Sequence, residues 1–137
     1  MALVLDSCIL IAEERRRGSV QNLLHQINAA FGPVDVGIST ITVIELTHGA
    51  YRARTSGDKL RRQVFAEAAV GDLIVYPVTL EIAQLAGRIE GEQAAKGIGI
   101  PFEDLIIGST ALYLGFDVLT QNVKHFQLIP GLNAVTL

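Results

Sequence analysis

The sequence has a single cysteine, no tryptophan and no long hydrophobic run. One cysteine, Cys8, excludes an internal disulfide and fits a reducing compartment. The longest hydrophobic stretch, residues 105–116, has 12 residues between Asp104 and Asp117, whereas a membrane span needs about 20. No basic residue precedes the apolar N-terminal stretch, and Asp6 interrupts it, so a secretory signal is not expected. We therefore predict a cytoplasmic protein without a membrane segment.

Several common catalytic motifs are also missing. The chain has neither the G-x-x-x-x-G-K-[ST] phosphate-binding loop nor G-x-G-x-x-G. Its three histidines, His25, His48 and His125, fit no zinc spacing and are interpreted as surface or core residues. No base lies near Ser7, Ser39 or Cys8 in the sequence, so a nucleophilic triad is unsupported.

The composition is that of a folded domain. Half of the 137 residues are hydrophobic and 18% are charged, which excludes a disordered chain. The length suits one domain with one core, residues 1–137. A mean hydropathy of +0.39 indicates elements buried on more than one face, or a surface that a partner covers.

The hydrophobic pattern alternates between strands and helices. Apolar runs ending in polar residues predict strands at 2–7, 36–40, 73–78, 118–120 and 133–137. Helical spacing predicts helices at 19–30, 41–54, 58–69, 79–96 and 102–114, with a loop around Gly57. Pro101 suits the first turn of the last helix. This alternation predicts a three-layer α/β/α sandwich with a mainly parallel sheet of about five strands. The direction of a strand that follows two successive helices stays open.

Three acids are predicted to meet at one edge of this sheet. Asp6 ends the first strand, Glu45 lies in the opening turns of the helix after the second, and Asp104 lies in the first turn of the helix before the fourth. Helices packed antiparallel to a strand begin at its carboxyl edge, where α/β folds bind ligands. Crowded carboxylates repel one another and raise each other's pKa, a cost that a divalent cation removes. Magnesium, which favours oxygen ligands, is the expected ion, with manganese as an alternative.

Each acid also has a purely structural interpretation. Asp6 could cap the turn after its strand. Thr42 and Glu45 match the capping box S/T-x-x-E. Asp104 could complement the positive end of its helix dipole. Convergence of all three favours the metal site over these alternatives.

Basic residues gather in two patches although the net charge is −3. One patch is Arg15, Arg16 and Arg17, and the other covers residues 52–62. Segregated charge of this kind can position the phosphates of RNA, whereas the simpler interpretation is a solvated helix face.

Three segments resemble VapC-type PIN domains. LDSCILIAEERR at residues 5–16 resembles their opening, where a strand ends in Asp followed by Ser or Thr. ISTITVIELTHGA at residues 38–50 resembles their second motif, and residues 100–132 resemble the third and fourth motifs together. The resemblance covers nearly the whole chain, and the last segment is its most specific part.

The resemblance implies a function. PIN domains of this type have a sheet of about five parallel strands and act as metal-dependent ribonucleases that use activated water. Many are toxins, inhibited by a cognate antitoxin whose peptide fills the acidic groove, and they commonly form homodimers. By this resemblance Asp6, Glu45 and Asp104 are the catalytic residues and the metal ligands, and RNA is the substrate.

The fourth acidic position departs from the family pattern. Asn122 stands where many members have aspartate, and an amide offers a neutral oxygen without charge. Asp117 is a poor substitute because it opens the predicted strand, roughly 10 Å from the carboxyl edge. Glu103 is adjacent to Asp104 but points some 100° away around the helix. Asn122 is thus a helper at most, and the number of metal ions stays open.

Two other functions compete with RNA cleavage. The first is a non-catalytic PIN-fold module that binds RNA or protein, which the missing fourth acid favours. The second is a phosphotransfer domain with an aspartate at a strand end, which lacks the second acid that such enzymes need. Metal-dependent cleavage of RNA distinguishes the first alternative from an enzyme.

Overall fold

Five parallel strands form one sheet in the order β3-β2-β1-β4-β5. The computed structural model describes all residues, 1–137. The strands are β1 (Ala2–Leu5), β2 (Asp35–Ser39), β3 (Ile74–Tyr76), β4 (Asp117–Leu119) and β5 (Ala134–Val135). The helices are α1 (Ser7–Arg15), α2 (Val20–Phe31), α3 (Thr40–Tyr51), α4 (Ser56–Asp72), α5 (Leu80–Ala94), α6 (Phe102–Leu114) and α7 (Val123–Phe126).

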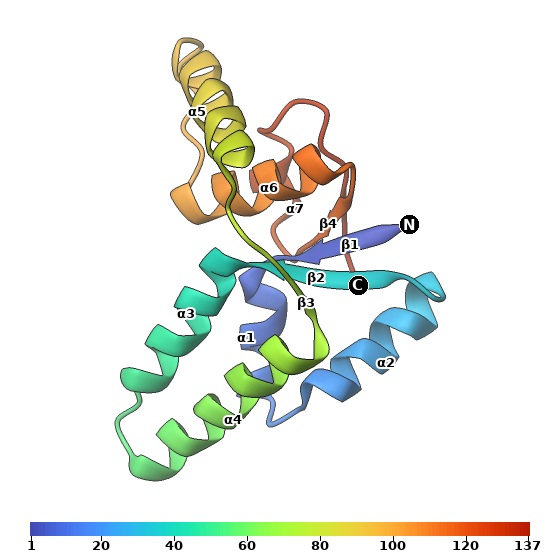
Figure 1. Cartoon of the computed structure of the whole chain (residues 1–137), viewed down its shortest axis with the longest axis vertical. Helices are drawn as coiled ribbons and strands as arrows, with labels where there is room; N and C mark the ends of the chain where they lie inside the picture. Colours follow the sequence, from blue (N-terminus) through green and yellow to red (C-terminus); the bar gives the residue numbers. More distant parts are fainter.

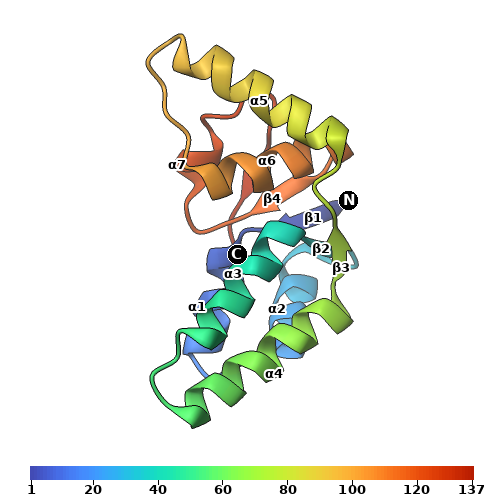
Figure 2. The ribbon, with the colours of Figure 1, turned by 60° about the vertical axis from the view of Figure 1, so that its left-hand side comes forward.

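Helices cover both faces of the sheet, which confirms the predicted α/β/α sandwich. In Figure 1, α1 to α4 lie below the sheet and α5 to α7 above it, and Figure 2 shows the same two layers from the side. All strand pairs are parallel, so the open question of strand direction is answered. None of the helices is both long and apolar enough to span a membrane.

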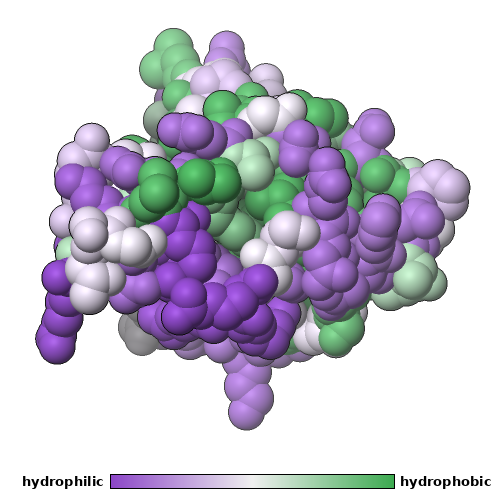
Figure 3. Space-filling model, turned by 90° about the horizontal axis from the view of Figure 1, so that it is seen from below, coloured by the Kyte–Doolittle hydropathy of each residue, from purple (hydrophilic) through white to green (hydrophobic).

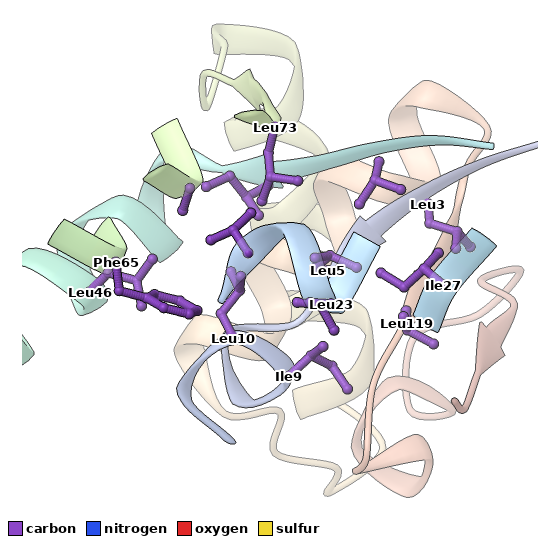
Figure 4. Close-up of a cluster of buried hydrophobic side chains, with 14 residues drawn as sticks. Leu3, Leu5, Ile9, Leu10, Leu23, Ile27, Leu46, Phe65, Leu73 and Leu119 are labelled. Carbon is purple, nitrogen blue, oxygen red and sulfur yellow. The ribbon is translucent and has the colours of Figure 1, made fainter. Parts of the chain in front are cut away.

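The strands supply apolar side chains alternately to the two layers. On β1, Leu3 and Leu5 pack with α1 to α4, whereas Val4 packs with α5 to α7. Figure 4 shows the first of these cores, where Leu10, Leu46 and other apolar side chains of the helices close on the sheet. Burial on both faces explains the high hydropathy, because neither side of the sheet is free to be polar.

Hydroxyl side chains start four of the helices. The capping residues accept hydrogen bonds from backbone N–H groups two or three residues later, at 3.0–3.2 Å. They are Ser19 before α2, Ser39 before α3, Thr55 before α4 and Thr79 before α5. Ser39, not Thr42, therefore caps α3, and the capping-box interpretation of Thr42 and Glu45 is wrong.

Two helices were not predicted from the pattern. The first strand ends at Leu5, and residues 7–15 form α1 instead of continuing as strand and loop. This helix buries Glu13 and Glu14 beside its apolar residues, so its buried face does not read as hydrophobic in the sequence. The second, α7, has four residues, which is too short for a helical period to show.

The predicted loop around Gly57 was misplaced, whereas the predicted bounds of α6, residues 102–114, are confirmed. Gly57 lies inside the first turn of α4, so the loop between α3 and α4 is residues 52–55. Thr55 sets this boundary, because its hydroxyl caps the helix at Asp58 N. Pro101 is the N-cap of α6 and lies just before its first turn.

Candidate active site

The carboxyl ends of β1, β2 and β4 bring distant residues together. Leu5 pairs with Leu119 across β1 and β4, and Asp6 N–H donates to the Leu119 carbonyl at 2.9 Å. Asp6 and Thr120 therefore lie next to each other although 114 residues separate them. On the other side of β1, β2 leads directly into α3, which carries Glu45.

Asp6 is buried, with 4% of its surface exposed, and neutral groups hold it. Its Oδ2 accepts hydrogen bonds from Thr120 Oγ1 at 2.7 Å and from Cys8 Sγ at 3.0 Å. Asp6 precedes α1, yet its side chain makes no capping hydrogen bond. The interpretation of Asp6 as a turn cap is therefore not supported. Burial, and next the hydrogen bond to Asp6, raise the pKa of Cys8 to about 11, so the thiol stays a neutral donor.

Glu45 is held by a relay of two buried hydroxyl groups. Ser7 Oγ donates to Glu45 Oε1 at 2.7 Å and lies 2.8 Å from Thr42 Oγ1. Because Ser7 has one hydroxyl proton and gives it to the carboxylate, Thr42 donates to Ser7. The burial of Thr42 is thus explained by the site and not by helix capping.

Asp104 is held from α7. His125 Nδ1 lies 2.8 Å from Asp104 Oδ2, and the imidazole is half exposed. The prediction of His125 as a surface or core residue missed this contact. Asp104 does lie in the first turn of α6, so its helix-dipole role is compatible with a role in the site.

The carboxylates are close enough to affect one another's titration. Burial raises the pKa of Glu45, and the negative charges of Glu103, Asp6 and Asp104 raise it further, while the Ser7 hydrogen bond opposes them. Burial also raises the pKa of Asp104, followed by the charge of Asp6, while His125 opposes. The three predicted acids therefore lie within electrostatic range of one another. Glu103 also acts on both groups, although the sequence placed it away from them.

The carboxylate oxygens at the sheet edge suit a hard cation, but the carboxylates are too far apart to surround one ion. Carboxylate oxygens are the ligands that magnesium and manganese prefer, and a cation would relieve the mutual repulsion. However, no three His, Cys, Asp or Glu side chains lie close enough together to bind one ion directly. Magnesium usually keeps several waters. The arrangement therefore fits a largely hydrated ion better than one enclosed by three carboxylates.

Asn122 and Asp117 take the places expected from the sequence. Asn122 precedes α7, is exposed, and donates its backbone N–H to Thr120 Oγ1 at 2.8 Å. Its side chain makes no capping hydrogen bond, so its oxygen is free. Asp117 opens β4, opposite Leu3, and lies away from the carboxyl edge.

The basic residues divide into two groups. Arg16 pairs with Glu13 at 3.2 Å, and Arg61 and Arg62 lie 3.1 and 3.6 Å from Glu14. Arg15 and Arg17 are exposed, and neither makes an ion pair. The role of Arg15, Arg16 and Arg17 in RNA binding stays a prediction, with Arg16 already engaged.

Sequence reasoning missed five residues that hold the acids. They are Ser7, Cys8, Thr42, Thr120 and His125. Thr120 directly follows β4, and Ser7 and Cys8 come just after Asp6 at the end of β1, so the signal that identified Asp6 could have found these three. Thr42 and His125 carry no comparable signal, because only the packing of α1 on α3 and of α7 on α6 brings them into place.

Comparison with known proteins identifies the class to which this fold and acidic edge belong. The family model "PIN domain" matches residues 3–131. "Ribonuclease VapC1" of Rickettsia felis is 29% identical over 137 residues, covering 100% of this chain and 97% of its own. The "tRNA(fMet)-specific endonuclease VapC" of Salmonella typhimurium is 32% identical over 95 residues, 69% of this chain and 70% of its own.

Solved structures agree with the sequence relatives. The DNA-bound VapBC structure from Salmonella typhimurium superposes with a TM-score of 0.83 at 25% identity and covers 99% of this chain and 98% of that one. VapBC2 of Rickettsia felis, at 21% identity, gives a TM-score of 0.84 with the same coverage and shows the same fold. The chain therefore belongs to the PIN-domain family, within its VapC group.

Proposed function

We propose that this protein is a magnesium-dependent endoribonuclease that hydrolyses RNA phosphodiester bonds in the cytoplasm. The observation that carries the proposal is the convergence of Asp6, Glu45 and Asp104 at one sheet edge. No lysine or arginine neutralises them there; hydroxyl, thiol and imidazole groups hold them instead. The names of the relatives, ribonuclease and tRNA endonuclease, support RNA as the substrate.

The acids would hold the metal through oxygens that their protein donors leave free. When bound, magnesium lowers the pKa of a water molecule and stabilises charge on a phosphoryl oxygen. Asp6 uses Oδ2 for both of its hydrogen bonds, Glu45 uses Oε1 and Asp104 uses Oδ2. One oxygen of each carboxylate is thus available. The Thr42–Ser7 relay and Thr120 fix the carboxylate orientation before the ion arrives, which reduces the entropic cost of assembling the site.

RNA cleavage is tested by incubating the purified chain with total RNA, with magnesium or with EDTA. Asp6→Asn is the test variant and Asp117→Asn is the matched control, because Asp117 lies on β4 of the same sheet away from the carboxyl edge. We expect cleavage only with metal, loss of cleavage in Asp6→Asn, and retention in Asp117→Asn. Equal cleavage by both variants would remove Asp6 from the mechanism.

A PIN-fold module without catalytic activity is the second candidate. Two observations favour it: an amide, Asn122, stands at the fourth acidic position, and no compact group of metal ligands is present. This module would bind RNA in EDTA and in magnesium alike and leave it intact in both.

We propose further that the protein is the toxin of a toxin–antitoxin pair and binds a cognate antitoxin. Support comes from structural neighbours that are VapBC assemblies, among them VapBC-5 of Mycobacterium tuberculosis, a member of the VapBC family of toxin–antitoxin systems. The test is growth arrest on expression of the chain alone, with relief when the cognate antitoxin is co-expressed. Arrest should require Asp6.

We also propose that the chain forms a homodimer. Large apolar side chains remain exposed on the single chain, among them Ile44, Leu80 and Phe102 at 66%, 70% and 61%. Exposed apolar surface of this kind is typical of protein interfaces. Sedimentation equilibrium checks the mass, and a monomer at micromolar concentration would contradict the proposal.

A further inference from the structure

A groove of about 560 Å³ extends from the acidic edge along α1 and α3. It is lined by Glu45, Leu46, His48 and Gly49 of α3 and by Arg52, the C-cap of that helix. The spacing of Glu45, His48, Gly49 and Arg52, at i, i+3, i+4 and i+7, places them on one helix face. Figure 2 shows α1 and α3 side by side below the sheet. Seven residues at 1.5 Å each put Arg52 roughly 10 Å from Glu45 along the helix.

Charged residues of both signs line this groove. The acids are Glu14, Glu45, Asp58 and Glu103, and the basic residues are Arg15, Arg52, Arg54 and Arg62. Glu14, Asp58 and Arg62 make ion pairs, which leaves Arg15, Arg52 and Arg54. These three arginines are exposed and form no ion pair, unlike Arg16, Arg61 and Arg62. Their guanidinium groups are therefore available for bidentate hydrogen bonds to phosphate. Figure 3 views the end of the molecule where the α3–α4 loop lies, and hydrophilic residues form a broad band across it.

Gly49 lines the groove without adding a side chain to it. It lies inside α3, where glycine is less favourable than alanine, and a Cβ at this position would meet no atom within 4 Å. Sterics within the fold therefore do not require glycine here. A side chain at this position would project into the groove instead.

We propose that this groove binds single-stranded RNA on one side of the scissile phosphate. Arg52 and Arg54 hold phosphates at the far end, Arg15 supports them from α1, and Gly49 leaves room for the strand. The volume lies in the range of sites that hold one small ligand, which suits a short stretch of one strand. The inference rests on the proposed function and assigns its substrate path.

The test measures binding of a labelled single-stranded RNA in EDTA and, separately, its cleavage in magnesium. Gly49→Met fills the groove, and Gly87→Met is the matched control, because Gly87 is also inside a helix with no atom near its missing Cβ. We expect Gly49→Met to weaken binding at least tenfold and to slow cleavage, and Gly87→Met to change neither.

The charged end is tested independently, so the proposal does not depend on Gly49→Met folding. Arg52→Gln with Arg54→Gln should reduce the salt slope of RNA binding by about 1.4, at about 0.7 per phosphate contact. Arg88→Gln with Lys96→Gln removes two cations outside the groove and should leave the slope unchanged. For each variant, the magnesium-induced rise in melting temperature should equal that of the wild type.

The possible outcomes separate this inference from the proposed function. Wild-type cleavage with unchanged binding in both groove variants overturns the inference and leaves the ribonuclease. RNA binding that depends on the groove without any cleavage overturns the ribonuclease and leaves the inference. Loss of antitoxin binding with unchanged RNA binding identifies the groove as a protein-docking surface and overturns the inference, as does a wild-type chain that does not bind RNA.

Discussion

The acids at the sheet edge and the buried acids of α1 differ in what holds them. At the sheet edge, Asp6, Glu45 and Asp104 accept hydrogen bonds from hydroxyl, thiol and imidazole groups and stay close to other acids. On α1, Glu13 and Glu14 are as deeply buried as Asp6, but arginine lies beside each of them. Burial of an acid does not by itself mark a site. A buried acid without a lysine or arginine nearby does indicate a functional site, because its negative charge still needs compensation.

The acids of α1 are structural. Glu13 accepts hydrogen bonds from Arg16, Asn22 and Gln26 at 3.1–3.2 Å, and so ties α1 to α2. Glu14 lies against Arg61 and Arg62 and ties α1 to α4. These contacts also explain why three of the eight basic residues in the two patches, Arg16, Arg61 and Arg62, are unavailable to RNA.

The largest expected effect is on activity. Asp6→Asn should lower RNA cleavage at least about a hundredfold, since it removes a charge that the metal needs, while the free energy of unfolding changes by less than about 1 kcal/mol. Cleavage assays and urea denaturation measure the two quantities. An unfolded Asp6→Asn variant would show that Asp6 belongs with the structural acids.

Next comes the stability of α1. Glu13→Ala should destabilise the protein by about 2–4 kcal/mol, because it removes three hydrogen bonds to a buried carboxylate. Urea denaturation gives the free energy, and Glu90→Ala on α5, an exposed acid without a salt bridge, is the control. If Glu13→Ala lost no more unfolding free energy than Glu90→Ala, the structural role assigned to the acids of α1 would be wrong.

A smaller effect is expected from metal binding. Ten millimolar magnesium or manganese should raise the melting temperature by a few degrees, since a ligand specific to the folded state stabilises it. Asp104→Ala should remove most of this rise, whereas Glu14→Gln should keep it at a lower starting temperature. A wild-type melting curve that does not respond to metal would favour the non-catalytic module.

The smallest effect is on the pH dependence of stability without metal. The folded-state pKa values of Glu45 and Asp104 are raised, mainly by burial, so the folded protein binds more protons than the unfolded chain just above the ordinary carboxyl pKa. Stability then falls as pH rises through this window. Glu45→Gln with Asp104→Asn should remove that part of the decline. Denaturation of both proteins in EDTA at several pH values measures the difference, and parallel curves would contradict the prediction.

Several features were predictable because they depend on local pattern. The mainly parallel sheet and the order of the five strands and of five of the seven helices follow from hydrophobic periodicity. The positions of Asp6, Glu45 and Asp104 follow from strand ends and helix starts. Residues 102–114 form α6 with Gly115 in the left-handed conformation after it, as the sequence indicates. Residues 105–111 of this helix are all buried, which agrees with the apolar run in the sequence.

The contacts of buried polar residues could not be predicted, because their partners are distant in the sequence and meet only in the folded chain. The helix α1 buries Glu13 and Glu14. Their partners on α2 and α4 offset the cost of removing these carboxylates from water. The pairing of His125 with Asp104 needs α7 to pack against α6.

The sequence by itself determined the fold class and the positions of the three acids at strand ends and helix starts, because strand and helix periods are local properties. Tertiary structure alone decided which arginines are free, which hydroxyl groups orient the carboxylates and where the groove runs. Those choices depend on pairs such as Ser7 with Thr42 and Arg61 with Glu14. Their members are 35 and 47 residues apart, and the energy of each contact exists only once both helices are packed.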